Sequence, residues 1–327
     1  MWALILVLMG PACTEEHGRA RGLIAKTPAV VMYKQAHTAL KEAEVQQLIW
    51  GVTPFVTSDG SVESHYEPTV RIVAERLSIP MQVLAGENYA DVEARLLAGS
   101  IDIAVMSPYA YVRARAKNPG IKAIATHIAN GTESYGAYIL AREDSDIRTL
   151  ADLRGKPFGF VDPHSSSGWL FPASRLLDAG MNPLSDIEGR FYGSHAAVIS
   201  AIASGEVAAG STYVAALAEG RGKIPGANKL RVIARTERIP YDAYVVRPDF
   251  PIKAILGFQK ALSSVSTRDP RGREALTSLE DINGFVRTDD AHYKRVRDVE
   301  KRVQSLTHLP GALLPTIVPK HTEQADP

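Results

Sequence analysis

Three consecutive serines, Ser165 to Ser167, are the residues whose type and spacing most clearly indicate a binding chemistry. They follow an apolar run, Pro157 to Val161, that is typical of a short buried strand, and they precede an amphipathic stretch, Trp169 to Leu177, that is typical of a helix. The first N–H groups of a helix have no partner within it, and the helix dipole places partial positive charge there. The sequence therefore predicts an anion site, with ordinary N-capping by serine as the alternative. Pro172 lies within the predicted helix, so we expect an irregular first turn.

A second polar helix start, Gly193-Ser194-His195, precedes a predicted helix that continues to Ala203. The imidazole of His195 could donate a hydrogen bond to the same anion, or it could simply cap the helix or face solvent. Serines and a histidine also raise the hypothesis of a hydrolase, but the chain has no G-x-S-x-G elbow. Its nine histidines form no H-x-x-x-H or H-E-x-x-H pattern, so we expect neither an enzyme nor a metal site.

Composition excludes several other classes of protein. The chain has 327 residues, of which 45% are hydrophobic and 22% charged, and its net charge is +1 at pH 7. A chain this close to neutral lacks the basic surface of nucleic-acid-binding and polybasic membrane-binding proteins. After residue 12, no stretch approaches the ~20 apolar residues of a membrane span. We therefore expect an ordinary globular protein with no nucleic-acid partner and no cofactor.

The N-terminus is typical of an export signal. Residues 1–10 are apolar and uncharged, and Cys13, the one cysteine in the chain, stands where a signal peptide would be cut. This arrangement resembles a bacterial lipoprotein signal, in which the cysteine is lipidated. The alternative is a buried N-terminal segment with an unpaired thiol. We expect residues 1–13 to be a lipobox-like signal peptide and residues 14–47 to be a tether and a peripheral helix.

Strand-like and helix-like segments alternate in two similar blocks, at about residues 48–136 and 142–234. This pattern predicts an α/β protein with largely parallel sheets. Beyond residue 246 the pattern is helical, and residues 307–327 are expected to be disordered. We predict two lobes, the first formed by residues 48–138 and 242–306 and the second by residues 139–241. Such lobes close by a hinge on a ligand in the cleft between them.

Several motifs together resemble the phosphate/phosphite/phosphonate substrate-binding family of ABC transporters. D-P-x-S-S-S-G, G-S-H and I-P-x-D occur in that family's order and spacing, and the resemblance covers about residues 48–300. It implies the two-lobed type II periplasmic binding protein fold. It also implies that a tetrahedral oxyanion is held by the serine hydroxyls, one histidine and two tyrosines, with a carboxylate facing the ligand. The implied residues in this sequence are Tyr89, Tyr135, Ser165, Ser166, Ser167, His195 and Asp242.

For three of these residues, the sequence alone leaves another role open. Tyr89 and Tyr135 could be core aromatics, and Asp242 could form a salt bridge at the hinge. In family members that bind aminophosphonates, a second carboxylate would fall near Ala215, where this chain has no acid. The resemblance therefore favours phosphate, phosphite, methylphosphonate or another small oxyanion over an aminoalkylphosphonate. His195 would add a pH dependence, because a protonated imidazole donates from both nitrogens.

The expected function is that of a monomeric periplasmic binding protein. It would capture a small phosphorus oxyanion and pass it to an ABC transporter permease, and only a lipid on Cys13 would attach it to a membrane. The alternative is a binding protein of the same fold that serves as a sensor component and reports to a membrane kinase.

Overall fold

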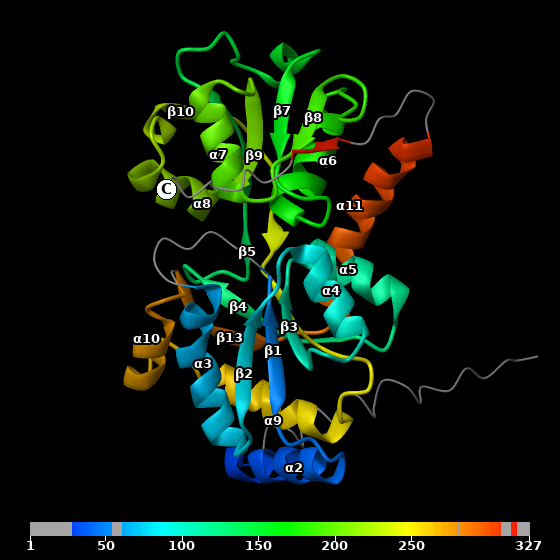
Figure 1. Ribbon diagram of the computed structural model, residues 1–327, viewed down its shortest axis with the longest axis vertical. Helices are drawn as coiled ribbons and strands as arrows, with labels where there is room; N and C mark the ends of the chain where they lie inside the picture. The colour runs from blue at the N-terminus through cyan, green and yellow to red at the C-terminus, as the bar shows by residue number, and fades with distance from the viewer. Residues whose placement is uncertain (1–27, 54–60, 280, 309–314, 319–327) are drawn as a thin grey trace, which may run out of the picture.

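The computed structural model describes residues 28–53, 61–279, 281–308 and 315–318, which form two α/β lobes (Figure 1). The first lobe contains a six-stranded sheet with the strand order β13-β4-β12-β3-β1-β2. Its strands are β1 (Leu48–Val52), β2 (Met81–Ala85), β3 (Ile103–Met106), β4 (Lys122–Ala129), β12 (Ala243–Val246) and β13 (Ile282–Arg287). The predicted signal peptide with Cys13 lies outside the described residues, as does the start of the tether.

The second lobe contains another six-stranded sheet, with the strand order β10-β6-β9-β7-β8-β14. Its strands are β6 (Ala137–Arg142), β7 (Pro157–Phe160), β8 (Glu188–Phe191), β9 (Ala209–Tyr213), β10 (Leu230–Arg235) and β14 (Thr316–Ile317). The chain passes into this sheet after β4 and returns after β10. A two-stranded antiparallel ribbon of β5 (Ser134–Tyr135) and β11 (Ile239–Pro240) joins the two crossing segments. We place the lobe boundaries at these two crossings.

Helices cover both sheets (Figure 1). Those of the first lobe are α2 (Ala29–Glu42), α3 (Val62–Leu77), α4 (Tyr89–Leu97), α5 (Pro108–Lys117), α9 (Ile252–Ser263) and α10 (Pro270–Leu276). Those of the second lobe are α6 (Phe171–Asp178), α7 (His195–Ser204) and α8 (Val214–Lys223). Short helical turns are η1 (Leu150–Leu153), η2 (Ser166–Leu170), η3 (Ala227–Lys229), η4 (Asp290–Tyr293) and η5 (Ser305–His308). Among the described residues, no helix is both long and apolar enough to cross a membrane.

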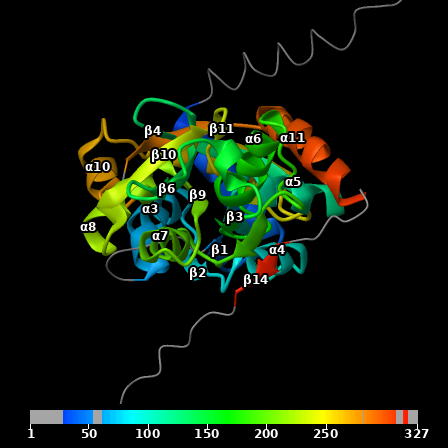
Figure 2. The same ribbon diagram turned by 90° about the horizontal axis from the view of Figure 1, so that it is seen from above.

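The last long helix, α11 (Lys294–Gln304), packs against α5 of the first lobe and α6 of the second (Figure 2). An ion pair between Arg302 and Asp178 links α11 to the end of α6. A second ion pair joins Arg297 of α11 to Asp290 in the preceding turn η4. The prediction assigned this helix to the first lobe alone. Its apolar stripe, with Val296, Val299 and Val303 buried, instead covers the junction of both lobes.

Each lobe has an aromatic core beneath its sheet. In the first lobe, Trp50 and Tyr244 are fully buried and pack edge to face, with ring centroids 5.9 Å apart. In the second lobe, Phe160 packs edge-on against Trp169 at 4.8 Å, and Trp169 also contacts Phe191. Burial of such rings stabilises a fold by apolar area and by favourable ring geometry. The second cluster holds η2, and therefore the serine run, against strand β7.

Four sequence expectations need correction. The C-terminal part is not purely helical, because β13 forms the edge of the first sheet, antiparallel to β4. Both sheets are mixed rather than largely parallel, since β12 and β6 run antiparallel to their neighbours. The sequence predicts a helix from Tyr66 to Leu77 with Pro68 in its first turn, whereas Ser61 caps a helix that already begins at Val62, so that Pro68 lies within α3. Part of the predicted tail is ordered as β14, which pairs with β8 and covers the edge of that sheet.

Candidate ligand-binding site

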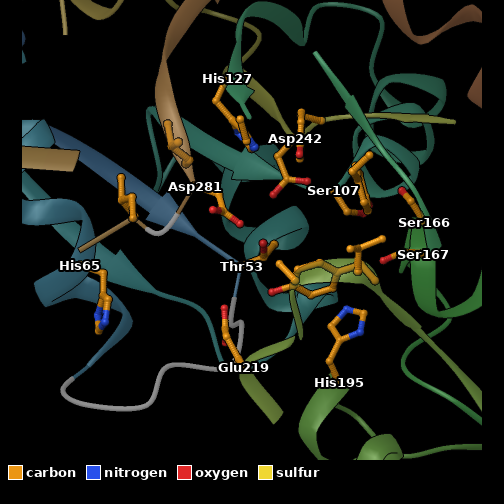
Figure 3. Close-up of a pocket in the computed structure, with 18 of the residues that line it drawn as sticks. Thr53, His65, Ser107, His127, Ser166, Ser167, His195, Glu219, Asp242 and Asp281 are labelled. Carbon is orange, nitrogen blue, oxygen red and sulfur yellow. The ribbon is translucent and has the colours of Figure 1, made fainter. Parts of the chain in front are cut away.

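One cavity of about 300 Å³ lies between the lobes, and both lobes and the β5–β11 ribbon line it (Figure 3). The structure brings all seven predicted ligand residues to its wall. They come from α4, β5, the turn after β7, the start of α7 and the residues after β11: Tyr89, Tyr135, Ser165, Ser166, Ser167, His195 and Asp242. A cavity enclosed between two hinged lobes is the usual place for a small ligand.

The serine run forms an unusually wide turn, η2, in which the Leu170 N–H donates to the Ser165 carbonyl. Ser165 caps this turn, because its Oγ accepts the Gly168 N–H at 2.9 Å. Pro172 has no N–H to donate to the Gly168 carbonyl, which would be its partner in an α-helix. That carbonyl instead accepts hydrogen bonds from the Val161 N–H and the Ser211 hydroxyl. The irregular first turn that Pro172 predicted is confirmed, and it leaves the serines facing the cavity.

The same turn contacts the first lobe directly. The Ser166 Oγ accepts the Tyr109 N–H at 2.9 Å, and the Ser107 hydroxyl donates to the His164 carbonyl at 2.8 Å. His164 also places its Nε2 3.6 Å from a carboxylate oxygen of Glu93 on α4. These contacts close the cleft along one edge. Ser166 uses only an acceptor position here, so its hydroxyl proton is available to a ligand.

Two tyrosines extend the donor set. The side chain of Tyr89 interacts with Ser165, and that of Tyr135 interacts with Ser167. Burial raises the pKa of both phenols well above its ordinary value, so both remain protonated donors at neutral pH. Tyr135 also stacks on Tyr241, with ring centroids 5.0 Å apart. The interpretation of these residues as core packing is therefore incomplete, because Tyr89 is buried, Tyr135 is partly buried, and both line the cavity.

His195 is the first residue of α7, and only 5% of its surface is exposed. Its Nδ1 lies 2.9 Å from the Thr212 hydroxyl, and its ring meets Tyr213 edge-on at 4.7 Å. Burial lowers the pKa of the imidazole to about 3, so the ring is neutral in the ligand-free protein. In the ligand-free protein, His195 therefore does not titrate near neutral pH.

Asp242 lines the cavity just beyond strand β11, and burial raises the pKa of its carboxyl to about 7. Within the described part of the chain, neither an ion pair nor a hydrogen bond to its carboxylate is found, and burial is the one cause that shifts its pKa. The structure therefore does not support a hinge salt bridge for this residue. The same described part contains no cluster of His, Cys, Asp and Glu side chains that could hold a metal ion.

The comparison with protein families identifies the family to which the chain belongs. Residues 50–293 match the family described as ABC transporter, phosphonate, periplasmic substrate-binding protein. The chain belongs to this family. The family resemblance that the serine, histidine and aspartate motifs predicted is thereby confirmed.

Curated proteins match parts of the chain. It is 30% identical over 166 residues to the phosphate-import protein PhnD of Mycolicibacterium smegmatis, covering 48% of this chain and 52% of that protein. It is 24% identical over 195 residues to the phosphonates-binding periplasmic protein of Escherichia coli, covering 58% of each. A further match, 26% identical over 140 residues, is the tetrathionate sensor histidine kinase TtrS of Salmonella typhimurium, covering 41% of this chain and 24% of that kinase. The chain spans about half the length, or less, of these relatives.

Solved structures confirm the fold. PhnD1 from Prochlorococcus marinus, in complex with methylphosphonate, superposes with a TM-score of 0.70 at 17% identity, covering 79% of this chain and 98% of that one. A binding protein component of an ABC phosphonate transporter from Pseudomonas aeruginosa gives 0.71 at 20% identity, covering 80% and 87%. The two-lobed type II periplasmic binding protein fold predicted for this family member is therefore confirmed.

Sequence reasoning missed further residues that line the cavity of this phosphonate-binding family member. They include Thr53, Ser107 and His127 from the first lobe, Glu219 from α8, Tyr241 from the crossing segment, and Asp281 before β13. Glu219 could have been found, because it follows Ala215 by one helical turn and so lies on the same face of α8. The others depend on long-range packing that no local pattern reports.

Replacing Asp242 by asparagine should raise the stability of the ligand-free protein at pH 8 by about 2–4 kcal/mol and change it little at pH 4. An acid whose folded-state pKa is raised from 3.8 to about 7 destabilises the fold progressively as pH rises between those values. Thermal unfolding of D242N and wild type at pH 4, 6 and 8 measures this. A D242N protein that is no more stable than wild type at pH 8 would show that the carboxylate is compensated in the native state.

Proposed function

We propose that this chain is an extracytoplasmic solute-binding protein that captures a small phosphorus oxyanion and delivers it to an ABC importer. The ligand class is phosphonate, phosphite or phosphate. The observation that supports this most strongly is the wide serine turn, which presents hydroxyls from Ser165, Ser166 and Ser167 to the interlobe cavity beside Tyr89 and His195. Membership of the phosphonate substrate-binding family supports the same function.

The donor set suits reversible capture. A buried anion needs several hydrogen bonds, because an unpaired buried charge costs several kcal/mol. In this proposal the three serines, Tyr89, Tyr135 and His195 supply them, and no Lys or Arg is among the described residues that line the cavity. Neutral donors bind less strongly than an Arg–phosphate pair, so the ligand can leave when the lobes open. No bond to the ligand is made or broken, and the protein acts without catalysis.

The remaining assignments follow from this role. We infer that the protein is periplasmic and works as a monomer with one ligand per pair of lobes, and that Cys13 carries a lipid anchor. A sensing role is the second candidate, and the similarity to a tetrathionate sensor kinase over 140 residues favours it. In both roles the chain would bind its ligand in the same cavity, so identifying the ligand is the first step in distinguishing the two roles.

Calorimetric titration of the ligand-stripped full chain tests the ligand class. At pH 7 we expect phosphate, phosphite or methylphosphonate to bind at least about 100-fold more tightly than sulfate, equivalent to about 2.7 kcal/mol. Sulfate has the same tetrahedral shape but carries no proton at this pH, so it cannot donate a hydrogen bond to Asp242 and is repelled by that carboxylate. Tightest binding of sulfate or of tetrathionate would contradict the phosphorus assignment, and tetrathionate would support the sensing role.

A further inference from the structure

A buried carboxylate lies where the first lobe meets the second. Glu93 is on α4, and only 2% of its surface is exposed. Helices α4 and α5 lie at the end of the first lobe that faces the second (Figure 1). In the described structure neither carboxylate oxygen of Glu93 accepts a hydrogen bond, since Lys117 at the end of α5 forms an ion pair with it that lacks hydrogen-bond geometry. A buried carboxylate without hydrogen bonds is costly, so a further donor would stabilise it.

The second lobe brings an imidazole to this carboxylate. The Nε2 of His164 lies 3.6 Å from a carboxylate oxygen of Glu93, and its Nδ1 lies 3.1 Å from the Oδ1 of Asp162 in its own turn. The backbone N–H of His164 donates to the same Asp162 oxygen at 2.7 Å, which fixes the turn. All three side chains are largely buried. The imidazole therefore stands between two carboxylates, one from each lobe.

Only a protonated imidazole suits both carboxylates. A neutral imidazole has one N–H group and one acceptor nitrogen. If Nδ1 carries the proton toward Asp162, the Nε2 lone pair faces Glu93, and the other tautomer places a lone pair against Asp162. In the imidazolium both nitrogens donate, and its positive charge lies between two negative ones. Because histidine changes its charge between pH 5 and 8, this contact between the lobes should depend on pH.

The other charged and titratable groups near this contact act differently. Lys117 pairs with Glu93 from within the first lobe, so that ion pair is present whether or not the lobes meet. Tyr89, on the same helix as Glu93, stays a protonated phenol because burial raises its pKa well above the ordinary value. Within the described part of the chain, Glu93 and Asp162 are the two acids that form ion pairs with His164. The dependence on pH is therefore assigned to the imidazole of His164.

Closure at this contact also assembles the donors of the ligand site. His164 directly precedes Ser165, and Glu93 follows Tyr89 by one helical turn. The side chains of Tyr89 and Ser165 interact with each other across the same boundary between the lobes. A motion that separates Glu93 from His164 would therefore also separate Tyr89 from the serine turn.

We propose that Glu93 and His164 form a proton-dependent latch between the lobes, which favours the closed, ligand-binding arrangement at acidic pH and weakens as the pH rises toward 8. This inference rests on the proposed function and concerns its regulation. When the lobes separate, His164 keeps Asp162 but loses Glu93, so the closed protein holds the proton more firmly than the open one. Linkage is reciprocal, so protonation of His164 favours closure by the same free energy by which closure favours protonation. Ligand affinity should therefore fall as pH rises through the range in which histidine titrates.

Ligand affinity at two pH values tests the latch. The tightest phosphorus ligand is titrated by calorimetry into wild type, Glu93→Gln and His164→Ala at pH 5.5 and pH 8. At pH 5.5 each variant should bind about 5- to 10-fold more weakly than wild type, whereas at pH 8 the difference should be within about 2-fold. The ligand and Asp242, whose pKa burial raises to about 7, titrate in all three proteins, so the ratio to wild type isolates the latch. His37→Ala, which removes an exposed histidine on α2, should match wild type at both pH values.

The double variant Glu93→Gln/His164→Ala completes a mutant cycle. At pH 5.5 it should bind no more weakly than either single variant, because both changes remove the same contact. Additive losses in the double variant would overturn the latch, as would single variants that lose the same factor at both pH values, which is the result expected of a purely structural role.

Small-angle X-ray scattering of the ligand-free chain gives a reading that needs no ligand. The radius of gyration of wild type should increase from pH 5.5 to pH 8 as the lobes open, and Glu93→Gln should be as open at pH 5.5 as at pH 8. A radius of gyration that is the same for wild type at both pH values would contradict the latch. If wild type binds no phosphorus oxyanion at either pH, the proposed function fails, and the scattering still decides whether the latch exists.

Discussion

Replacing Ser165 and Ser166 together by alanine should weaken phosphonate binding at least about 100-fold and leave the protein folded. Each hydroxyl that donates to a charged group contributes about 1.5–3 kcal/mol, so the loss of two corresponds to two or more orders of magnitude in affinity. Ser165 also caps the turn through the Gly168 N–H, and the loss of such a cap costs about 1 kcal/mol of stability. The effect on binding should therefore far exceed the effect on folding.

Calorimetric titration with the tightest phosphorus ligand, alongside thermal unfolding, measures both effects. Ser185→Ala is the matched control, since it removes an exposed serine hydroxyl of the same lobe away from the cavity. It should bind like wild type. Unchanged affinity in the folded double variant would remove the serine turn from the binding site, whatever the ligand.

Replacing Gly168 by alanine should abolish tight binding and reduce stability by about 1–3 kcal/mol. A Cβ at this position would lie 2.4 Å from the side-chain carbons of Val161 and 2.9 Å from the Ser165 Oγ. These distances are far below van der Waals contact, and both neighbours are buried, so the turn must move. A displaced turn misaligns all three serine hydroxyls at once, and hydrogen bonds weaken steeply with poor geometry.

Gly222→Ala is the control for this change, because a Cβ there meets no atom within 4 Å. Gly222 lies inside α8, where alanine favours the helix by up to about 1 kcal/mol, so this variant should be as stable as wild type or more so. Denaturant unfolding and titration of both variants give the comparison. A Gly168→Ala protein that binds as tightly as Gly222→Ala would mean that the turn tolerates the methyl group and that its wide geometry is not required.

Much of this protein follows from local sequence patterns. The apolar run that ends at Val161, the serines and the helix behind them were predicted as a strand, a turn and a helix, and the structure has β7, η2 and α6 there. Asn88 precedes a helix-like stretch, Tyr89 to Ala98, a pattern that predicts an N-cap, and its side chain accepts the Asp91 N–H at 3.0 Å. Such features depend on residues a few positions apart, so the sequence contains all the information that they need. The motifs around them also sufficed to identify the family.

The tertiary structure decided what depends on distant residues. The sequence of strand β13, Ile-Asn-Gly-Phe-Val-Arg, has only a weak strand pattern. The strand forms because it can pair with the free edge of β4 and because its Phe285 side chain becomes buried. Only the folded lobes show that Asp242 lines the cavity without a counter-charge and that Glu219 and His127 line the same cavity. The hydrogen-bond donors and acceptors around a ligand come from segments that are far apart in the chain. Local patterns therefore predict the serine turn, whereas the rest of the cavity wall emerges only when the two lobes fold together.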